Sequence, residues 1–150
     1  MNKRKTFLLP FLVILLLLSG CSNKDIERHY YDYQGENESW KAEYIVNATV
    51  IFTDNNGFLH VDSESEEIFI LTYKGELSDL SSVRLFEYGY KSPTEGGESS
   101  GEYSADNPIN TKTFKLRSGS KNGALPNEDT VYTVTVNMDG VKQSFELRSE

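Results

Sequence analysis

The chain has 150 residues, in which 15 Lys and Arg stand against 23 Asp and Glu for a formal net charge of -8. This length suits one domain with a modest core and is too short for a barrel enzyme. The acidic balance excludes a basic nucleic-acid binder, and a single cysteine excludes a disulfide scaffold.

The first twenty residues have the pattern of an export signal. Lys3, Arg4 and Lys5 precede an apolar run from Phe7 to Leu18. A run of this length matches the h-region of a signal peptide and is too short to span a bilayer comfortably. We therefore predict a signal peptide over residues 1–20. Without it, the chain keeps 12 Lys and Arg against 23 acidic residues, a net charge of -11.

The segment Leu18-Ser19-Gly20-Cys21 resembles the lipobox of bacterial lipoproteins. The resemblance implies that the sulfur of Cys21 receives diacylglycerol, that cleavage makes Cys21 the first residue, and that fatty acids such as palmitate hold the protein on the extracytoplasmic face of the cell membrane. Two acyl chains are enough for stable anchoring. The alternative is an ordinary secretory signal followed by a chance cysteine.

Residues 22–38 are polar and charged apart from Ile26 and three tyrosines, and they show no lasting period of two or 3.6. With Cys21 in front of it, this segment is predicted to be a flexible, lipid-anchored tether over residues 21–38. About 17 residues of flexible coil reach on the order of 20–25 Å, so we expect the domain at 39–150 to stand off from the lipid.

From Trp40 onward the sequence alternates between apolar and polar residues, which predicts strands with one buried face. Strands are expected over Trp40–Thr53, Phe58–Val61, Ile68–Tyr73, Val83–Tyr90, Thr111–Arg117, Val131–Met138 and Val141–Leu147. A long irregular loop is expected over Lys91–Pro108, because it is rich in Gly, Ser and Pro. The one candidate for a helix is Leu77–Val83.

The clearest local prediction is the last hairpin, which turns at Asp139-Gly140. Pairing Met138 with Val141 places Tyr132 opposite Leu147 on the dry face. Six or seven such strands favour an all-β fold, an antiparallel two-layer sandwich of the immunoglobulin-like or fibronectin type III-like kind. A partly open barrel is the alternative.

The sequence offers little for catalysis. His29 and His60 are the two imidazoles, no nucleophile motif or phosphate-binding loop accompanies them, and no His/Cys spacing fits zinc. We therefore expect no catalytic residues and no cofactor. Asp54, Asp62 and Glu64 are candidate oxygen ligands for a weak calcium site, although acidic runs are usually solvated.

Two further alternatives concern acidic pairs and aromatic residues. The pairs Glu36/Glu38 and Glu66/Glu67 invite comparison with a carboxylate-based hydrolase, but adjacent strand residues point to opposite faces. Tyr31, Tyr33 and Tyr103 are candidate partner contacts. The favoured interpretation is that Tyr33 and Trp40 fold inward as core anchors, because Trp40 is in phase with the apolar face that follows.

The segment from Tyr33 to Tyr44 also resembles the Y-x-G-E-x-x-x-W-K-x-x-Y start of small lipoproteins of bacilli and related Gram-positive bacteria. The resemblance implies membrane attachment on the outer face and a β-rich domain, with Gly35 permitting a turn and Trp40 opening the first strand. It carries no reaction. We expect a monomeric, non-catalytic binding or scaffolding module whose partner is an envelope protein or the cell wall.

Overall fold

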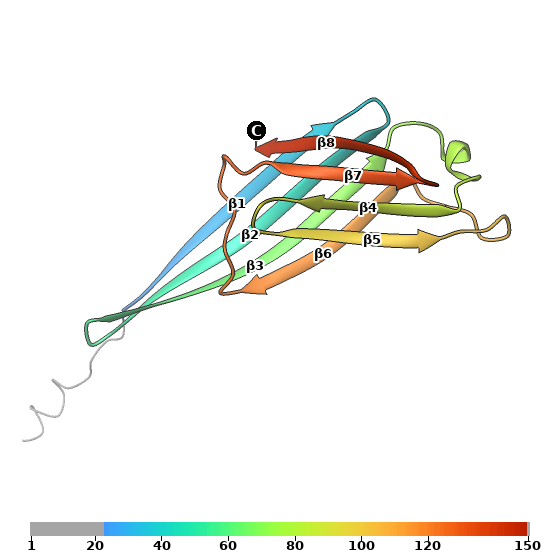
Figure 1. Cartoon of the computed structure of the whole chain (residues 1–150). Helices are drawn as coiled ribbons and strands as arrows, with labels where there is room; N and C mark the ends of the chain where they lie inside the picture. Colours follow the sequence, from blue (N-terminus) through green and yellow to red (C-terminus); the bar gives the residue numbers. More distant parts are fainter. Residues whose placement is uncertain (1–22, 150) are drawn as a thin grey trace, which may run out of the picture.

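The computed structural model describes residues 23–149, so the predicted signal peptide and Cys21 lie outside the described part. Within residues 23–149, eight strands form one sheet in the order β5-β4-β7-β8-β1-β2-β3-β6, and all neighbours are antiparallel (Figure 1). The elements are β1 (Asn23–Glu36), β2 (Trp40–Asn55), β3 (Phe58–Tyr73), η1 (Leu77–Leu80), β4 (Leu85–Lys91), β5 (Gly96–Glu102), β6 (Thr113–Lys121), β7 (Tyr132–Met138) and β8 (Val141–Ser149).

The sheet curls until its edge strands, β5 and β6, approach each other, which makes it a nearly closed, barrel-like sheet. The antiparallel all-β expectation is confirmed, but the two-layer immunoglobulin-like or fibronectin-like sandwich is not what forms. The physical reason is β1, which pairs with β2 on one side and with β8 on the other through Tyr33–Ser149 and Gln34–Arg148. This narrow ladder joins two halves that would otherwise be separate sheets. Within residues 23–149 no helix is long and apolar enough to cross a membrane.

The expected flexible tether at 21–38 is wrong over most of its length. Asn23–Glu36 is a strand, and its ladder with β2 runs from Asn23–Asp54 to Glu36–Lys41. Backbone hydrogen bonds carry this pairing, so it does not require alternating apolar side chains. Most side chains of Lys24–Tyr30 are exposed, which is why hydropathy did not reveal the strand.

Three strands run well beyond the barrel-like body as a narrow finger, at the lower left of Figure 1. We define the finger as residues 23–30 of β1, 47–55 of β2 and 58–63 of β3, since the ladder between β3 and β6 ends at Glu64–Lys121. Eight strand residues span roughly 25 Å. The finger therefore has the reach expected of the tether, but as an ordered sheet.

The core lies inside the curled sheet and is strongly aromatic. The even-numbered residues of β2 from Trp40 to Ala48 are buried, which confirms the predicted period of two. Trp40 has no exposed surface and its ring lies 5.6 Å from that of Phe86 and 4.9 Å from that of Tyr73. Tyr33 is also fully buried, so both residues are the core anchors that the sequence favoured.

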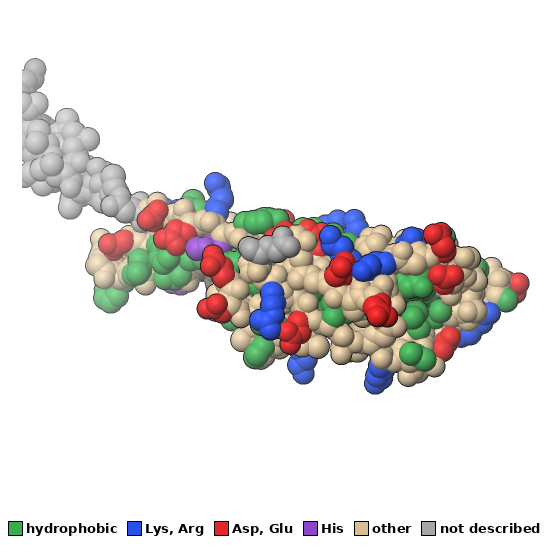
Figure 2. All heavy atoms as spheres, turned by 90° about the horizontal axis from the view of Figure 1, so that it is seen from above, with side chains coloured by type: hydrophobic (Ala, Val, Ile, Leu, Met, Phe, Trp, Pro, Cys, Tyr) green, Lys and Arg blue, Asp and Glu red, His purple; other side chains and the backbone are tan. Residues whose placement is uncertain are grey.

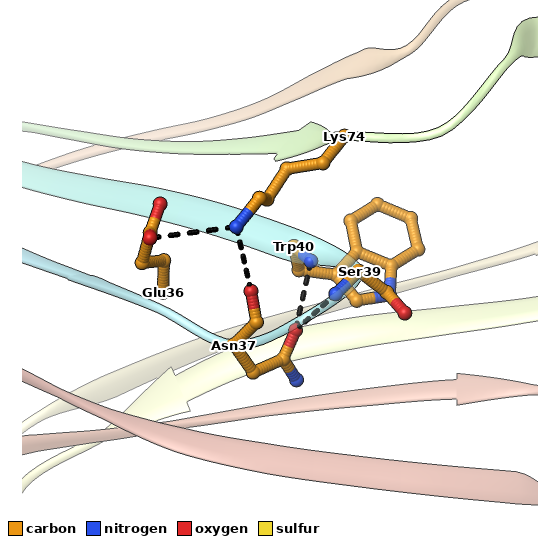
Figure 3. A network of polar contacts seen from close by, with 5 residues as sticks. All are labelled: Glu36, Asn37, Ser39, Trp40 and Lys74. Atoms are coloured by element: carbon orange, nitrogen blue, oxygen red, sulfur yellow. Dashed lines mark hydrogen bonds and ion pairs between the residues drawn. The ribbon is translucent and has the colours of Figure 1, made fainter.

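The turn between β1 and β2 lies at the end of the molecule opposite the finger tip and is organised by Asn37 (Figure 3). Its side-chain oxygen accepts hydrogen bonds from the backbone N–H groups of Ser39 and Trp40, at 2.9 and 2.8 Å. Its backbone carbonyl accepts one from Lys74 Nζ at 2.9 Å, and the same amine lies 3.4 Å from Glu36 Oε1. The turn is thus at residues 37–39. Gly35 lies within β1, and Trp40 opens the second strand rather than the first.

Two further outcomes concern the C-terminal half. The predicted register of the last hairpin is confirmed in full, from Met138–Val141 to Tyr132–Leu147. The expected irregular loop at Lys91–Pro108 is wrong in its centre, where Gly96–Glu102 forms the edge strand β5 against β4. Small residues are unfavourable in isolated strands, but here the β4 ladder supplies the backbone partners.

Candidate functional site

A polar cluster lies inside the body where the finger joins it, centred on the carboxylate of Glu67. Ser65 Oγ donates to Glu67 Oε1 at 2.7 Å, and Ser118 Oγ and Tyr44 Oη donate to Oε2 at 2.8 and 3.1 Å. These donors come from β2, β3 and β6. A buried charge is costly unless hydrogen bonds replace its lost water, and this arrangement supplies them.

A second carboxylate, that of Glu95, approaches the same interior from the turn between β4 and β5. The backbone of the turn is fixed by Ser92, whose N–H donates to the Glu95 carbonyl at 2.8 Å. The Glu95 carboxylate accepts a short hydrogen bond from the hydroxyl of Tyr132. Burial raises the pKa of Glu95 above its ordinary value; hydrogen bonds from Tyr132 and Tyr44 lower it, and the charge of Glu67 raises it.

Four tyrosines pack together in the same interior. Tyr44 packs against Tyr90 and Tyr132, with ring centroids 4.5 and 4.7 Å apart, and Tyr33 meets Tyr132 edge-on at 5.0 Å. Burial raises the pKa of Tyr33 to about 12 and raises the pKa values of Tyr44 and Tyr132 as well. These hydroxyls therefore stay protonated near neutral pH and act as hydrogen-bond donors.

The chemistry available to this cluster depends on access. A carboxylate-based hydrolase needs two acids that face a bound substrate. Glu95 borders a surface hollow that is formed mainly by β4, β5 and β7. A second hollow lies at the root of the finger, around Arg28 and Glu66. Glu67 lines neither of these two hollows. With only 9% of its surface exposed and three internal donors, Glu67 acts as a structural acceptor that ties β2, β3 and β6 together.

The larger hollow is a polar groove on the outer face of the body. Its floor is formed by Thr133, Thr135 and Asn137 of β7, and Glu87 and Lys142 lie among its other lining residues. Asn137 is buried and its Nδ2 donates to Glu87 Oε2 at 2.5 Å, while its Oδ1 is shielded from solvent and has no hydrogen-bond partner among the described residues. The hydroxyl, amide and charged groups among these lining residues can form hydrogen bonds with a polar ligand or peptide.

The structure separates the three tyrosines predicted as partner contacts. Tyr33 is in the core, where its hydroxyl donates to the carbonyl of Asn127 at 2.7 Å, so it presents no surface. Tyr31 is half-buried and stacks between His29 and Tyr33, with centroid distances of 6.1 and 6.4 Å. Tyr103 is also half-buried and packs against the core from the segment after β5. The three tyrosines therefore do not form one surface.

The three candidate calcium ligands are not brought together either. By register, Asp54 lies on the inner face of the finger, while Asp62 and Glu64 lie on its outer face. Asp62 Oδ1 is 3.3 Å from His60 Nε2, and Glu64 Oε1 is 3.4 Å from Lys121 Nζ. Among the described residues no group of three His, Cys, Asp or Glu side chains is placed to hold a metal ion.

The sequence did not reveal the cluster formed by these two carboxylates. Glu67 was considered as half of the acidic pair Glu66/Glu67, although it is in phase with the buried residues Phe69 and Leu71, and that phase indicates an inward side chain. Its neighbour Glu66 is exposed, as expected for adjacent strand residues. No local pattern marks Glu95, because the position of its turn depends on the pairing of β4 with β5.

In comparisons with known proteins, no family model, no curated protein and no solved structure matches this chain.

Proposed function

We propose that this chain is a bacterial lipoprotein, anchored through Cys21 to the extracytoplasmic face of the cell membrane, whose barrel-like domain binds or scaffolds an envelope partner without chemistry. The observation that carries the proposal is the succession of a basic n-region, an apolar h-region and Leu18-Ser19-Gly20-Cys21 directly before a folded domain.

The position of the first described residue supports this proposal. Asn23 opens β1 two residues after Cys21 and lies at the tip of the finger, opposite Asp54. A lipid on Cys21 would therefore hold the tip near the membrane and the body roughly 25 Å farther out, the length of eight strand residues. The finger would replace the flexible tether as an ordered spacer with a defined direction.

The polar groove on β4 and β7 is the surface that we propose for the partner. It lies on the body, away from the finger, and its lining residues include Thr133 and Thr135 of β7. The groove chemistry fits a polar peptide or a cell-wall polymer.

Metabolic labelling with a fatty acid tests the anchor. The wild-type protein should carry the label and sediment with membranes. Cys21→Ala should lose both properties, while Ser22→Ala serves as a matched control that leaves the cysteine in place. Label on Cys21→Ala, or wild-type protein free of label in the soluble fraction, would contradict the anchor.

Site-specific photocrosslinking in intact cells tests the groove. A crosslinker at Thr135, on the groove floor, should give a discrete adduct. The same crosslinker at Lys115, exposed on β6, provides the control. Equal adducts from both positions, or none from Thr135, would remove the groove from the proposal and leave the anchor untouched.

A further inference from the structure

The tip of the finger carries a concentration of exposed apolar side chains. Phe58 is 80% exposed, Leu59 66%, and Ile26 and Val61 49% each. Figure 2 shows hydrophobic side chains at this narrow end, beside acidic ones. Apolar groups gathered at one end of a molecule indicate a contact with something apolar.

The apolar side chains lie on both faces of the finger. Ile26 pairs with Ile51 and Phe58 with Asn55, which places Ile26 and Phe58 on the outer face. Leu59 pairs with Asp54 and Val61 with Phe52, which places Leu59 and Val61 on the inner face. A protein docked on the sheet would cover one face. Immersion in an apolar medium covers both, which favours a lipid bilayer as the occupant.

The N-terminal end of the described chain lies at this same tip. Asn23 faces Asp54, next to the turn that leads to Phe58. Cys21 is two residues earlier in the sequence, and two residues span at most about 7 Å of extended chain. A membrane that holds Cys21 therefore lies within reach of the apolar tip.

Charged groups around the tip limit the depth of contact. Asp54 Oδ1 accepts a hydrogen bond from the Gly57 N–H at 2.8 Å, and exposed Asp25 lies nearby opposite Phe52. Carboxylates remain in the hydrated interface, so the apolar side chains can reach only the boundary between headgroups and acyl chains. Because the chain carries a net negative charge, anionic lipid would not strengthen its binding to the membrane.

We propose that the β2–β3 hairpin tip, with Phe58, Leu59 and Val61 and with Ile26 beside them, inserts into the interface of the bilayer that holds Cys21. The hairpin then forms a second membrane contact next to the acyl chains and fixes the direction in which the body projects. This inference rests on the proposed function for the statement that the bilayer is the one that holds Cys21. Contact of the apolar tip with lipid does not require that the cell acylates Cys21.

The test joins the thiol of Cys21 chemically to a maleimide lipid in phosphatidylcholine vesicles, using the chain from Cys21 to Glu150. This attachment makes the result independent of whether the cell acylates Cys21. Phe58→Trp supplies an indole at the tip, and Val141→Trp supplies one at an exposed position of the β7–β8 hairpin. Trp40, fully buried in the core, contributes the same background to both variants.

Brominated phosphatidylcholine should quench the added indole of Phe58→Trp and leave that of Val141→Trp unchanged. Absence of quenching at position 58, or equal quenching at both positions, would overturn the proposal. A shift in Phe58→Trp emission that follows protein concentration without vesicles would assign the tip to a second copy of the chain, and would also overturn it.

A second measurement uses the chain from Ser22 to Glu150, which has no anchor. Replacing Phe58 and Leu59 together by Ser should weaken its partition into phosphatidylcholine vesicles by about tenfold or more, because two large apolar side chains leave the lipid contact. Leu77→Ser, an exposed leucine on η1, is the matched control and should not change partition. Unchanged partition of the double variant would contradict the proposal. Both tip residues are exposed, so the melting temperature should be retained.

Discussion

Gly35 of β1 lies directly against the backbone carbonyl of Glu146 on β8, at the place where the two halves of the barrel-like sheet meet. A Cβ on residue 35 would overlap the carbonyl oxygen and would also crowd the side chain of Leu147, 3.1 Å away. The glycine in the Y-x-G-E segment is therefore explained by close approach of two backbones at the seam of the sheet.

This relationship predicts that Gly35→Ala separates β1 from β8. Because the obstruction is backbone rather than a flexible side chain, we expect the free energy of unfolding to fall by about 1–3 kcal/mol. Chemical denaturation measures the change, and Glu38→Ala, exposed in the neighbouring turn, should differ from wild type by less than about 0.5 kcal/mol. A Gly35→Ala protein as stable as wild type would show that the seam can open at no cost.

Asn37 predicts a contrast within one turn. Asn37→Ala removes acceptors for two backbone N–H groups and a donor to Gln143, so it should lower the free energy of unfolding by about 1–2 kcal/mol. Glu36→Gln removes only the exposed ion pair with Lys74 and should cost less than about 1 kcal/mol. Thermal or denaturant melts of both variants give the comparison. If Glu36→Gln is the more damaging change, the account of this turn is wrong.

The interior cluster predicts that Tyr44→Phe destabilises the protein through Glu67. The variant keeps the ring but removes one of three donors to a buried carboxylate, which should cost about 1–3 kcal/mol. Tyr30→Phe, with the tyrosine 62% exposed on the finger, is the matched control and should be neutral. Equal melting temperatures for the two variants would mean that Glu67 does not need the Tyr44 hydroxyl.

Glu95 predicts a specific pH dependence. Burial raises its pKa in the folded protein above the ordinary 4.5, so the folded state holds this proton more tightly than the unfolded chain does. The stability from this group is complete below the ordinary pKa and is lost as the pH rises through the folded pKa. Glu95→Gln cannot titrate. The free energy of unfolding of this variant, relative to that of the wild type, should therefore rise as the pH increases above the ordinary pKa of 4.5.

Denaturant melts at several pH values measure this difference, and subtraction of the wild-type curve removes the titration of the other acids. Glu98→Gln, exposed on the adjacent strand β5, should show no such trend. A difference that is constant with pH, or that moves in favour of wild type as the pH rises, would contradict the assigned direction.

The parts of the fold that were predicted from sequence are those in which side-chain pattern and backbone pairing coincide. The alternation from Trp40 is confirmed as far as Ala48, and the register of the Asp139-Gly140 hairpin is confirmed at every predicted pair. The finger strand Asn23–Tyr30 and the edge strand Gly96–Glu102 have little or no dry face, so only their backbone partners reveal them. Glu95 was missed for the same reason, since its place depends on a long-range ladder.

The most direct test of the proposed anchor is the mass of the N-terminal peptide of the protein purified from its native membrane fraction. The account predicts that the chain begins at Cys21, that residues 1–20 are absent, and that the cysteine carries a diacylglyceryl group. A chain that still begins at Met1, with the thiol of Cys21 free, would contradict it.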